Sequence, residues 1–452
     1  MTKNKTTILT AALCLLALNG AAQERYISLQ ECIDLSHSNN PDVVNASLDM
    51  RAARAQKQEV FTNWFPSVSV TAGGFHALNP LLKVGLEDVL GSTDAANNLR
   101  YYAETVAGLS GVNTEWNMLG TGYAAALSVQ QPIFAGGRIA NGNALAALGV
   151  KAAEVKNEMA VRDNDDTVTS KYWTVVSLGE KKKALQQGID LVASLQKDVE
   201  AAVDAGLAKQ SDLLQVKLQA NELGTTMKKL RSGERLAKMD LFNAIGMEYS
   251  VLGLDEMKLS DGFDGLQAPE NYYQDEESVA ASMSESKLLE MSVESKKLEK
   301  KIALGEALPQ VAVGASMGYG QVIGDPRGNG LVYAMVKIPI SDWAKTSRKL
   351  QRSQVEIEKA QNDKDYLERQ LLLKVNMDWI SLQNAWSQMM DSDEAVSLSE
   401  LLEQQKREEY DAGMCTMTEL LKTQSDLQTA KSAYVDSAVE YLNALSAWNK
   451  DR

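Results

Sequence analysis

Two patterns of apolar positions alternate along the chain, one with the period of a long helix and one with the period of a strand. In the helical pattern, apolar residues recur three and four positions apart, for example at Leu213, Val216, Ala220, Leu223 and Met227. This spacing is typical of helices that pack in coiled-coil fashion. Residues 138–203 and 345–410 carry similar seams and contain no proline. At ~1.5 Å per residue, each predicts on the order of 100 Å of helix, which must pack against other helices of the same or neighbouring chains.

The strand pattern is an alternation of apolar residues with small or polar ones. It predicts four strands, at about residues 66–76, 122–134, 309–323 and 330–341. Each has roughly the ten residues that a tilted strand needs to cross a bilayer, with one apolar face. A soluble sheet with one wet face would give a similar pattern, so both interpretations stay open at this point. The connection at 76–121 is long, and it fits either a cover over a barrel mouth or a tolerated insertion.

The chain also repeats itself. Residues 204–215, DAGLAKQSDLLQ, align with residues 411–422, DAGMCTMTELLK, at an offset of 207 residues. At the same offset, Pro132 in QPIFAGGR matches Pro339 in IPISDWAK. Such self-similarity predicts a duplicated unit of strand, long helix, tight turn and long returning helix. We expect a first repeat at 23–248, a linker of short elements at 249–278, a second repeat at 279–452, a first tip at about 204–212 and a second tip at about 411–419.

Each tip contains a glycine followed by polar residues. Gly206 and Gly413 can adopt the left-handed conformation that ends a helix. Ser211-Asp212 in the first tip and Thr418-Glu419 in the second are expected to cap the helix that follows. A plain helical hairpin would contain the same kind of turn, but recurrence of the turn with similar polar neighbours favours a functional tip.

The first 22 residues have the pattern of a secretory signal peptide. Lys3 and Lys5 precede an apolar core at 8–18, and small residues follow at 20–22. Removal of the two lysines would change the formal charge from −14 to −16. This acidity argues against nucleic acid as a partner, because phosphate binding needs a basic face. No later stretch is apolar and long enough for a membrane helix, so a membrane-spanning part would have to consist of strands.

The order of these features resembles that of the TolC family of outer-membrane efflux and secretion channels. The resemblance rests on the signal peptide, SLQECIDLSHSNNP at 28–41, helix-ending prolines, QPIFAGGR at 131–138 and the two glycine tips. It implies a mainly α fold with a small β part. Three copies would each give four strands to one 12-stranded outer-membrane β-barrel above a long periplasmic α-helical barrel. The implied function is a passive exit duct of a Gram-negative tripartite efflux or type I secretion system, gated at its tips when an adaptor and an inner-membrane transporter dock.

The resemblance also implies roles for individual tip residues. Ser211 and Asp212 match a linking pair of the first hairpin, Tyr410 matches their tyrosine partner, and Glu419 matches an acidic ring at the entrance. Two positions depart from the family pattern: Cys415 stands in place of an arginine, and Lys422 in place of a second acid. Without the arginine, the tip would lose a charge-assisted bond to the aspartate. A lysine at position 422 would weaken the selectivity of the entrance for cations.

The tip turns themselves are a second candidate site. Leu207 and Met414, which follow the tip glycines Gly206 and Gly413, could contact an adaptor. Packing of these two side chains against the helix ends is the equally plausible structural explanation.

Other classes of protein fit the sequence less well. The two histidines, His37 and His76, lack metal-ligand spacing, and no glycine-rich segment has the lysine and hydroxyl of a phosphate loop, so we predict no catalytic, cofactor or metal site. Cys32 and Cys415 are predicted to be free thiols. The main alternative is a periplasmic adaptor with coiled-coil hairpins, but an adaptor would have one long hairpin, with its strands elsewhere. The transported substrate cannot be deduced, because in such systems the inner-membrane partner selects it.

Overall fold

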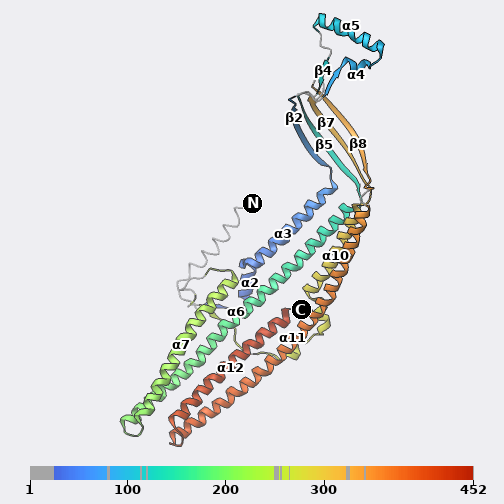
Figure 1. Ribbon diagram of the computed structural model, residues 1–452. Helices are drawn as coiled ribbons and strands as arrows, with labels where there is room; N and C mark the ends of the chain where they lie inside the picture. Colours follow the sequence, from blue (N-terminus) through green and yellow to red (C-terminus); the bar gives the residue numbers. More distant parts are fainter. Residues whose placement is uncertain are drawn as a thin grey trace. The chain divides into compact units, whose positions relative to one another are not determined.

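The structure is a computed structural model that describes residues 25–78, 82–111, 115–118, 121–248, 254, 257–263, 265–321, 326–340 and 343–450. The signal peptide predicted at 1–22 lies outside these residues. The described chain is mainly helical, with few strands (Figure 1). None of its described helices is both long and apolar enough to cross a membrane. Two compact units are distinguished, one formed by Met1–Ala52, Lys151–Met291 and Asn362–Arg452, the other by Ala53–Val150 and Ser292–Gln361.

Two long helical hairpins form most of the first unit. The first hairpin consists of α6 (Arg138–Asp204) and α7 (Gln210–Ile245), and the second of α11 (Trp343–Asp411) and α12 (Met417–Lys450). The seam predicted from the apolar spacing is buried: α6 and α7 pack around Val192, Val199, Leu213, Val216 and Leu223. Leu420 and Leu421 of α12 belong to the same cluster, so the two hairpins share a core near their tips. Full burial of such side chains contributes about 1.5–3 kcal/mol each.

Short elements pack near the ends of α7 and α12 that lie away from the tips. α2 (Leu29–Asn39) begins at Ser28, whose hydroxyl accepts a hydrogen bond from the Glu31 amide at 3.2 Å. β1 (Arg25–Ile27) pairs in parallel with β6 (Met257–Leu259) of the linker. The linker continues through η2 (Pro269–Tyr272) and α9 (Glu276–Ser282) into α10 (Ser284–Gly305), and α3 (Pro41–Phe61) with η1 (Thr62–Trp64) follows α2. The Tyr172 hydroxyl of α6 donates to Asp261 Oδ2 at 2.6 Å and so ties the linker to the long helix.

The second unit contains a four-stranded antiparallel sheet. Its strands are β2 (Ser67–His76), β5 (Thr121–Ala135), β7 (Gln310–Gln321) and β8 (Arg327–Lys337), in the order β2-β5-β7-β8. The central pair, β5 and β7, joins the two repeats. Their register shifts between Pro132 and Phe134, as expected for a proline inside a central strand, which cannot donate to the ladder and is tolerated at a bulge.

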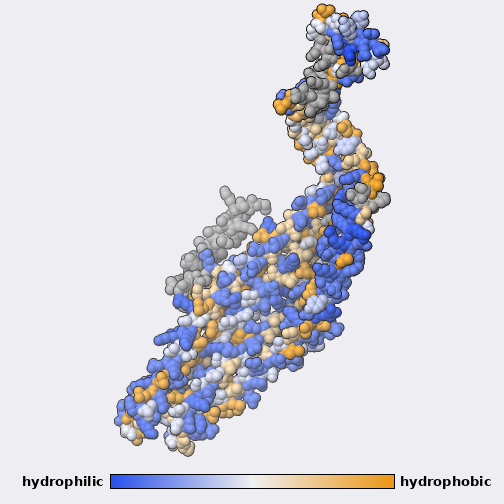
Figure 2. Space-filling model, in the orientation of Figure 1, coloured by the Kyte–Doolittle hydropathy of each residue, from blue (hydrophilic) through white to orange (hydrophobic). Residues whose placement is uncertain are grey.

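The pairing register places apolar side chains on one face of this sheet. Val70 lies opposite Leu127, and Leu127 lies opposite Met317. These side chains are exposed. On β2, β5 and β7 the other face carries mostly small and polar residues, and the Ser128 and Ser316 hydroxyls meet there at 3.2 Å. On β8 this face also carries Leu331, Tyr333 and Met335. In Figure 2 the visible surface of the strands is mostly white and light orange, with few of the strongly hydrophilic residues that cover the helices of the first unit.

An insertion follows β2. β3 (Leu82–Gly85) pairs with β4 (Glu115–Met118), and between them lie α4 (Leu86–Leu90) and α5 (Asp94–Ser110). Thr93 caps α5 through a hydrogen bond from the Ala96 amide at 3.2 Å, and Gly111 ends it with a φ of 65°. The long connection predicted at 76–121 therefore contains secondary structure of its own.

Candidate functional site at the helical tips

The two tips have the same backbone geometry. In the first, the Gly206 amide donates to Val203 O at 2.9 Å and the Leu207 amide to Ala202 O at 2.7 Å. In the second, Gly413 donates to Tyr410 O at 2.9 Å and Met414 to Glu409 O at 2.8 Å. These paired bonds form a Schellman motif, which satisfies the last carbonyls of α6 and α11. It requires a left-handed residue, and the predicted glycines supply it, with φ of 75° at Gly206 and 73° at Gly413.

The residues that cap the two helices after the tips are not the ones predicted from the sequence. α7 begins after Lys209, an N-cap that makes no side-chain hydrogen bond in the described chain, so Ser211 and Asp212 do not cap it. Both lie within the first turn, where the Ser211 hydroxyl donates to Asp212 Oδ1 at 3.3 Å. Asp212 is still well placed, since a carboxylate in the first turn interacts favourably with the helix dipole.

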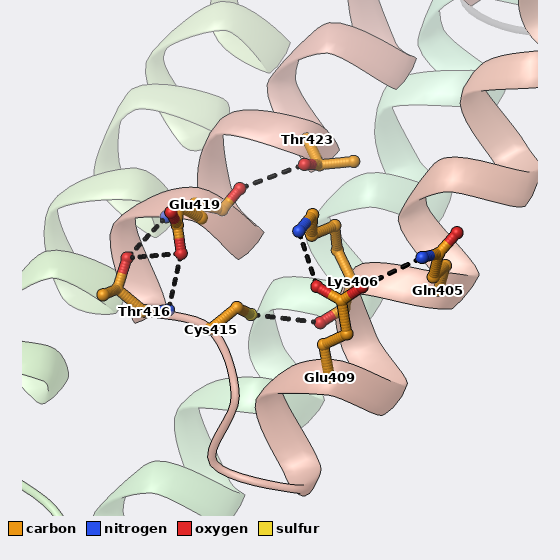
Figure 3. A network of polar contacts seen from close by, with 7 residues as sticks. All are labelled: Gln405, Lys406, Glu409, Cys415, Thr416, Glu419 and Thr423. Atoms are coloured by element: carbon orange, nitrogen blue, oxygen red, sulfur yellow. Dashed lines mark hydrogen bonds and ion pairs between the residues drawn. The ribbon is translucent and has the colours of Figure 1, made fainter.

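In the second tip the capping residue is Thr416 and not Thr418. Thr416 Oγ1 accepts from the Glu419 amide at 3.3 Å, and Glu419 Oε2 accepts from the Thr416 amide at 2.8 Å (Figure 3). This reciprocal pair is a capping box. The hydrogen bonds from the amide and hydroxyl of Thr416 lower the pKa of Glu419. The Glu419 carboxylate, predicted for an acidic ring, is therefore engaged within its own helix.

A second polar group stabilises the end of α11. Lys406 Nζ lies 2.5 Å from Glu409 Oε2, and Gln405 Nε2 donates to Glu409 Oε1 at 2.9 Å (Figure 3). The hydrogen bond from Lys406 is the main cause of the lowered pKa of Glu409. Cys415 Sγ donates to Lys406 O at 3.3 Å, so this thiol binds the backbone within its own tip. Its pKa is raised, chiefly by burial.

Tyr410 is the penultimate residue of α11, at the second tip. Its ring packs against the apolar cluster that α6, α7 and α12 share. Its pKa is raised, first by burial and next by the negative charge of Asp212. No hydrogen bond joins these two side chains among the described residues. Among the described residues, the predicted partners are therefore linked by charge and by no hydrogen bond.

The direct polar link between the tips involves two residues that the sequence prediction did not pair. Thr418 Oγ1 of α12 donates to Gln215 Oε1 of α7 at 3.0 Å. The repeat offered a signal, because Thr418 occupies the position of Ser211. Lys422, one turn further along α12, is exposed and has no ion pair within the described part of the chain.

The apolar residues after the tip glycines do not pack against the helix ends. Leu207 is 85% exposed and Met414 is 73% exposed. These values disfavour the alternative in which the two side chains fill helix-end contacts. Each tip therefore presents one large apolar side chain to its surroundings.

The remaining candidate groups lie elsewhere. Cys32 is a buried free thiol in the cluster around α2 and α6, where burial raises its pKa to about 12. His37 Nε2 lies 2.6 Å from Asp165 Oδ1, and His76 Nδ1 lies 2.7 Å from Thr121 Oγ1. The described residues contain no group of three or more histidine, cysteine or acidic side chains that could hold a metal ion.

This chain is similar to a known protein family in sequence and to several solved structures in fold. Residues 32–223 match the protein family described as outer membrane efflux protein. The crystal structure of the CmeC outer membrane channel of Campylobacter jejuni is similar, with a TM-score of 0.72 and 14% identity over 94% of this chain and 85% of that chain. A membrane protein from Pseudomonas aeruginosa gives a TM-score of 0.74 and 15% identity over 94% and 92% of the two chains. VceC from Vibrio cholerae, an outer membrane protein, gives 0.73 and 13% over 94% and 95%. None of the curated proteins matches the chain in sequence.

Proposed function

Taking the confirmed likeness to outer membrane efflux proteins as the premise, we propose that this chain is the outer-membrane exit duct of a tripartite efflux or type I secretion system. Three copies form a passive channel, without catalysis or a cofactor. The strands lie in the outer membrane of a Gram-negative bacterium and the long helices extend through the periplasm.

The four-stranded sheet is the main observation in support of this proposal. Its four strands have 10 to 15 residues, long enough to cross a bilayer when tilted, and one face exposes apolar side chains such as Val70 and Met317. β2 and β8 are edge strands. Lipid does not tolerate an open edge, so β8 of one copy must pair with β2 of the next. Three copies would close a barrel of 12 strands.

The helices support an assembly of several copies. Leu373, Met377 and Ile380 of α11 are exposed and lie four and three positions apart, which places them on one stripe of the helix. An apolar stripe of this kind normally packs against another helix. Helices of neighbouring copies would cover it in a continuous helical barrel.

The two tips are proposed as the periplasmic gate. The gate residues are Ser211, Asp212, Tyr410, Glu419 and Lys422. The Thr418–Gln215 hydrogen bond and the packing of Tyr410 support this assignment, because both join the two hairpins through contacts that can be broken without unfolding a helix. Docking of an adaptor and an inner-membrane transporter would open the gate. The exposed Leu207 and Met414, presented by the turns at Gly206 and Gly413, are the proposed adaptor contacts.

Planar-bilayer conductance of the purified protein, together with its oligomeric mass in the same detergent, tests this function. A trimer with small, steady conductance is expected for a duct with closed tips. A soluble monomer without channel activity would contradict the proposal and favour the alternative of a periplasmic adaptor.

A further inference from the structure

The exposed apolar stripe of α11 is interrupted by two acidic residues, and a basic groove lies at the same height on the first hairpin. We propose that Asp391 and Glu394 of one copy, the acidic pair, bind Arg231 and Arg235 in the groove between α6 and α7 of the neighbouring copy. This contact fixes the register in which copies of the chain assemble, in the middle of the long helices and away from their tips. The inference rests on the proposed trimer.

The acidic pair belongs to the same stripe of α11 as Ile380. Alternating steps of four and three positions lead from Ile380 to Asp391 and Glu394, and then to Leu398 and Leu401. These five side chains are all exposed. A stripe with this spacing packs against another helix. Carboxylates inside a packed stripe are costly unless a cation meets them, so the surface that covers α11 must be positively charged at this height.

The groove between α6 and α7 supplies that charge. Its volume is about 560 Å³, and its basic lining residues are Lys182, Lys183, Arg231, Arg235 and Lys238. Its two acidic residues are already engaged, Glu234 by Lys182 and Lys238, and Asp190 by Gln186. Arg231 and Arg235 are exposed and make no ion pair or hydrogen bond within the described part of the chain. Both guanidinium groups therefore remain for carboxylates, which they can bind through paired hydrogen bonds.

This basic groove lies on the side of the first hairpin that faces away from α12. Lys181 and Ala184 line a separate groove beside α12, where Lys181 pairs with Asp436. Lys183 and Gln186, which line the basic groove, follow them by two positions, about 200° around an α-helix. In a closed ring the same pair of surfaces recurs, so the side that is not used within the chain meets the second hairpin of the next copy. α12 already packs against its own first hairpin, which leaves α11 to fill the groove.

The height of the groove can be followed from α7 to α12. The hydrogen bond between Thr418 and Gln215 places these two parallel helices side by side at an offset of 203 positions. Arg231 and Arg235 are therefore level with residues 434–438 of α12.

Contacts between α12 and α11 give the corresponding height on α11. The rings of Tyr441 and Trp386 have centroids 5.1 Å apart, and Lys431 Nζ lies 2.8 Å from Glu400 Oε1. Between these contacts, residues 434–438 of α12 lie beside about residues 391–395 of α11, because antiparallel helices have the same rise per residue. A symmetry axis along the helices preserves this height from one copy to the next. Since α7 and α11 run in opposite directions, the first arginine meets the second acid of the pair, and the second arginine meets the first.

The distance from the tips separates this contact from the gate. Glu394 precedes Asp411, the last residue of α11, by about 25 Å of helix at 1.5 Å per residue. Charged pairs within an apolar interface favour one register and one partner over others. The acidic pair and the basic groove are therefore a means by which copies of this chain recognise one another.

Charge reversal tests the pairing. Glu394→Lys places a cation opposite Arg231 and is expected to lower the fraction of trimer in detergent several-fold, measured by native mass spectrometry. Arg231→Glu added to it should restore the trimer. Asp393→Lys is the matched control, because Asp393 is exposed on the same helix but lies off the stripe, and it should assemble as the parent does. Far-UV circular dichroism of each variant checks that the helices are folded.

Cross-linking tests the contact without dependence on assembly strength. Arg231→Cys with Glu394→Cys, in a Cys415→Ser background, should give covalent dimers and trimers with a short bis-maleimide. Gln215→Cys with Thr418→Cys is the control and should cross-link within the monomer. Normal assembly of Glu394→Lys, together with no cross-link between copies in a trimer whose control pair reacts, would overturn the inference and leave the proposed duct intact. A parent protein that is monomeric and forms no channel would contradict the proposed function as well.

Discussion

The Thr418 hydroxyl lies 3.0 Å from the side-chain oxygen of Gln215, although 203 positions separate the two residues. The contact joins the first turn of α12 to the second turn of α7, two helices that leave different tips. The apolar cluster beneath it contains Leu213 of α7 and Leu420 and Leu421 of α12, so the link lies at the edge of a packed surface. It can therefore open while the hairpins themselves stay folded.

Removal of the Thr418 hydroxyl should loosen the tips. A net hydrogen bond contributes about 0.5–1.5 kcal/mol, and this one is exposed, so Thr418→Val is expected to act at the low end of that range. The prediction is a higher single-channel conductance than that of the parent protein. Thr225→Val is the matched control, since the Thr225 hydroxyl bonds only the Asn221 carbonyl of its own helix, at 2.9 Å. Equal conductance for both variants would argue against a gating role for the link.

The pair formed by Tyr410 and Asp212 gives a second test of the gate. Tyr410→Phe keeps the ring in the apolar cluster and removes the hydroxyl, and Asp212→Ala removes the neighbouring charge. We expect the double variant to conduct more than either single variant, because both changes act on the same junction. Single-channel recordings of the three variants measure this. If the double variant conducts as the parent does, the gate assignment is wrong, although the fold is unaffected.

The first tip turn requires a glycine because of its left-handed backbone conformation, and not because space for a side chain is lacking. Gly206 has a φ of 75°, and a Cβ added there would meet no atom within 4 Å. Gly206→Ala should therefore cost roughly 1–2 kcal/mol through the left-handed backbone and nothing through a clash. Gly224, inside α7, has equally open surroundings, and Gly224→Ala is expected to stabilise by about 0.5–1 kcal/mol. Chemical denaturation of the two variants should thus move the midpoint in opposite directions.

The sequence was most informative where a period or a glycine determines the structure. Spacings of three and four predicted the buried seam of Leu213, Val216 and Leu223, because a helix can bury only one such stripe. The left-handed tip glycines also followed from backbone sterics. The order of these features carried the family resemblance, which the match at 32–223 and the shared fold confirm.

Side-chain partners at the tips were harder to predict, because several hydroxyls compete for each position. Thr416, Thr418 and Ser211 are all acceptable caps from their sequence positions. The turn length decides between them: α12 begins at Met417, so Thr416 becomes the cap and Thr418 is left free to reach Gln215. The capping box between Thr416 and Glu419 was not predicted, because Thr418 was expected to cap the helix. Contacts across 203 positions depend on how two hairpins pack, which local pattern does not specify.

A pH dependence is expected where α6, α7 and the linker meet. Glu234 Oε2 lies 2.5 Å from Lys182 Nζ, and Glu234 Oε1 lies 3.2 Å from Lys238 Nζ. Lys238 also donates to Leu254 O and Met257 O, so the cluster ties the linker to α7. Burial is the largest single influence and raises the pKa of Glu234, but the hydrogen bond from Lys182 and the charges of both lysines outweigh it and lower the pKa from 4.5.

The sign of the effect follows from this lowered pKa. A carboxyl whose folded pKa lies below its unfolded value stabilises the fold above the unfolded pKa, and this stabilisation is lost as the pH falls through the folded pKa. Glu234→Gln should therefore reduce the urea midpoint at pH 7, and the difference from the parent protein should shrink as the pH falls below about 4.5. Glu222→Gln, an exposed position on the same helix, serves as the control and should change little at either pH. A Glu234→Gln deficit that stays constant between pH 7 and pH 3 would mean that the side chain acts through packing, and that its ionisation does not hold the linker to α7.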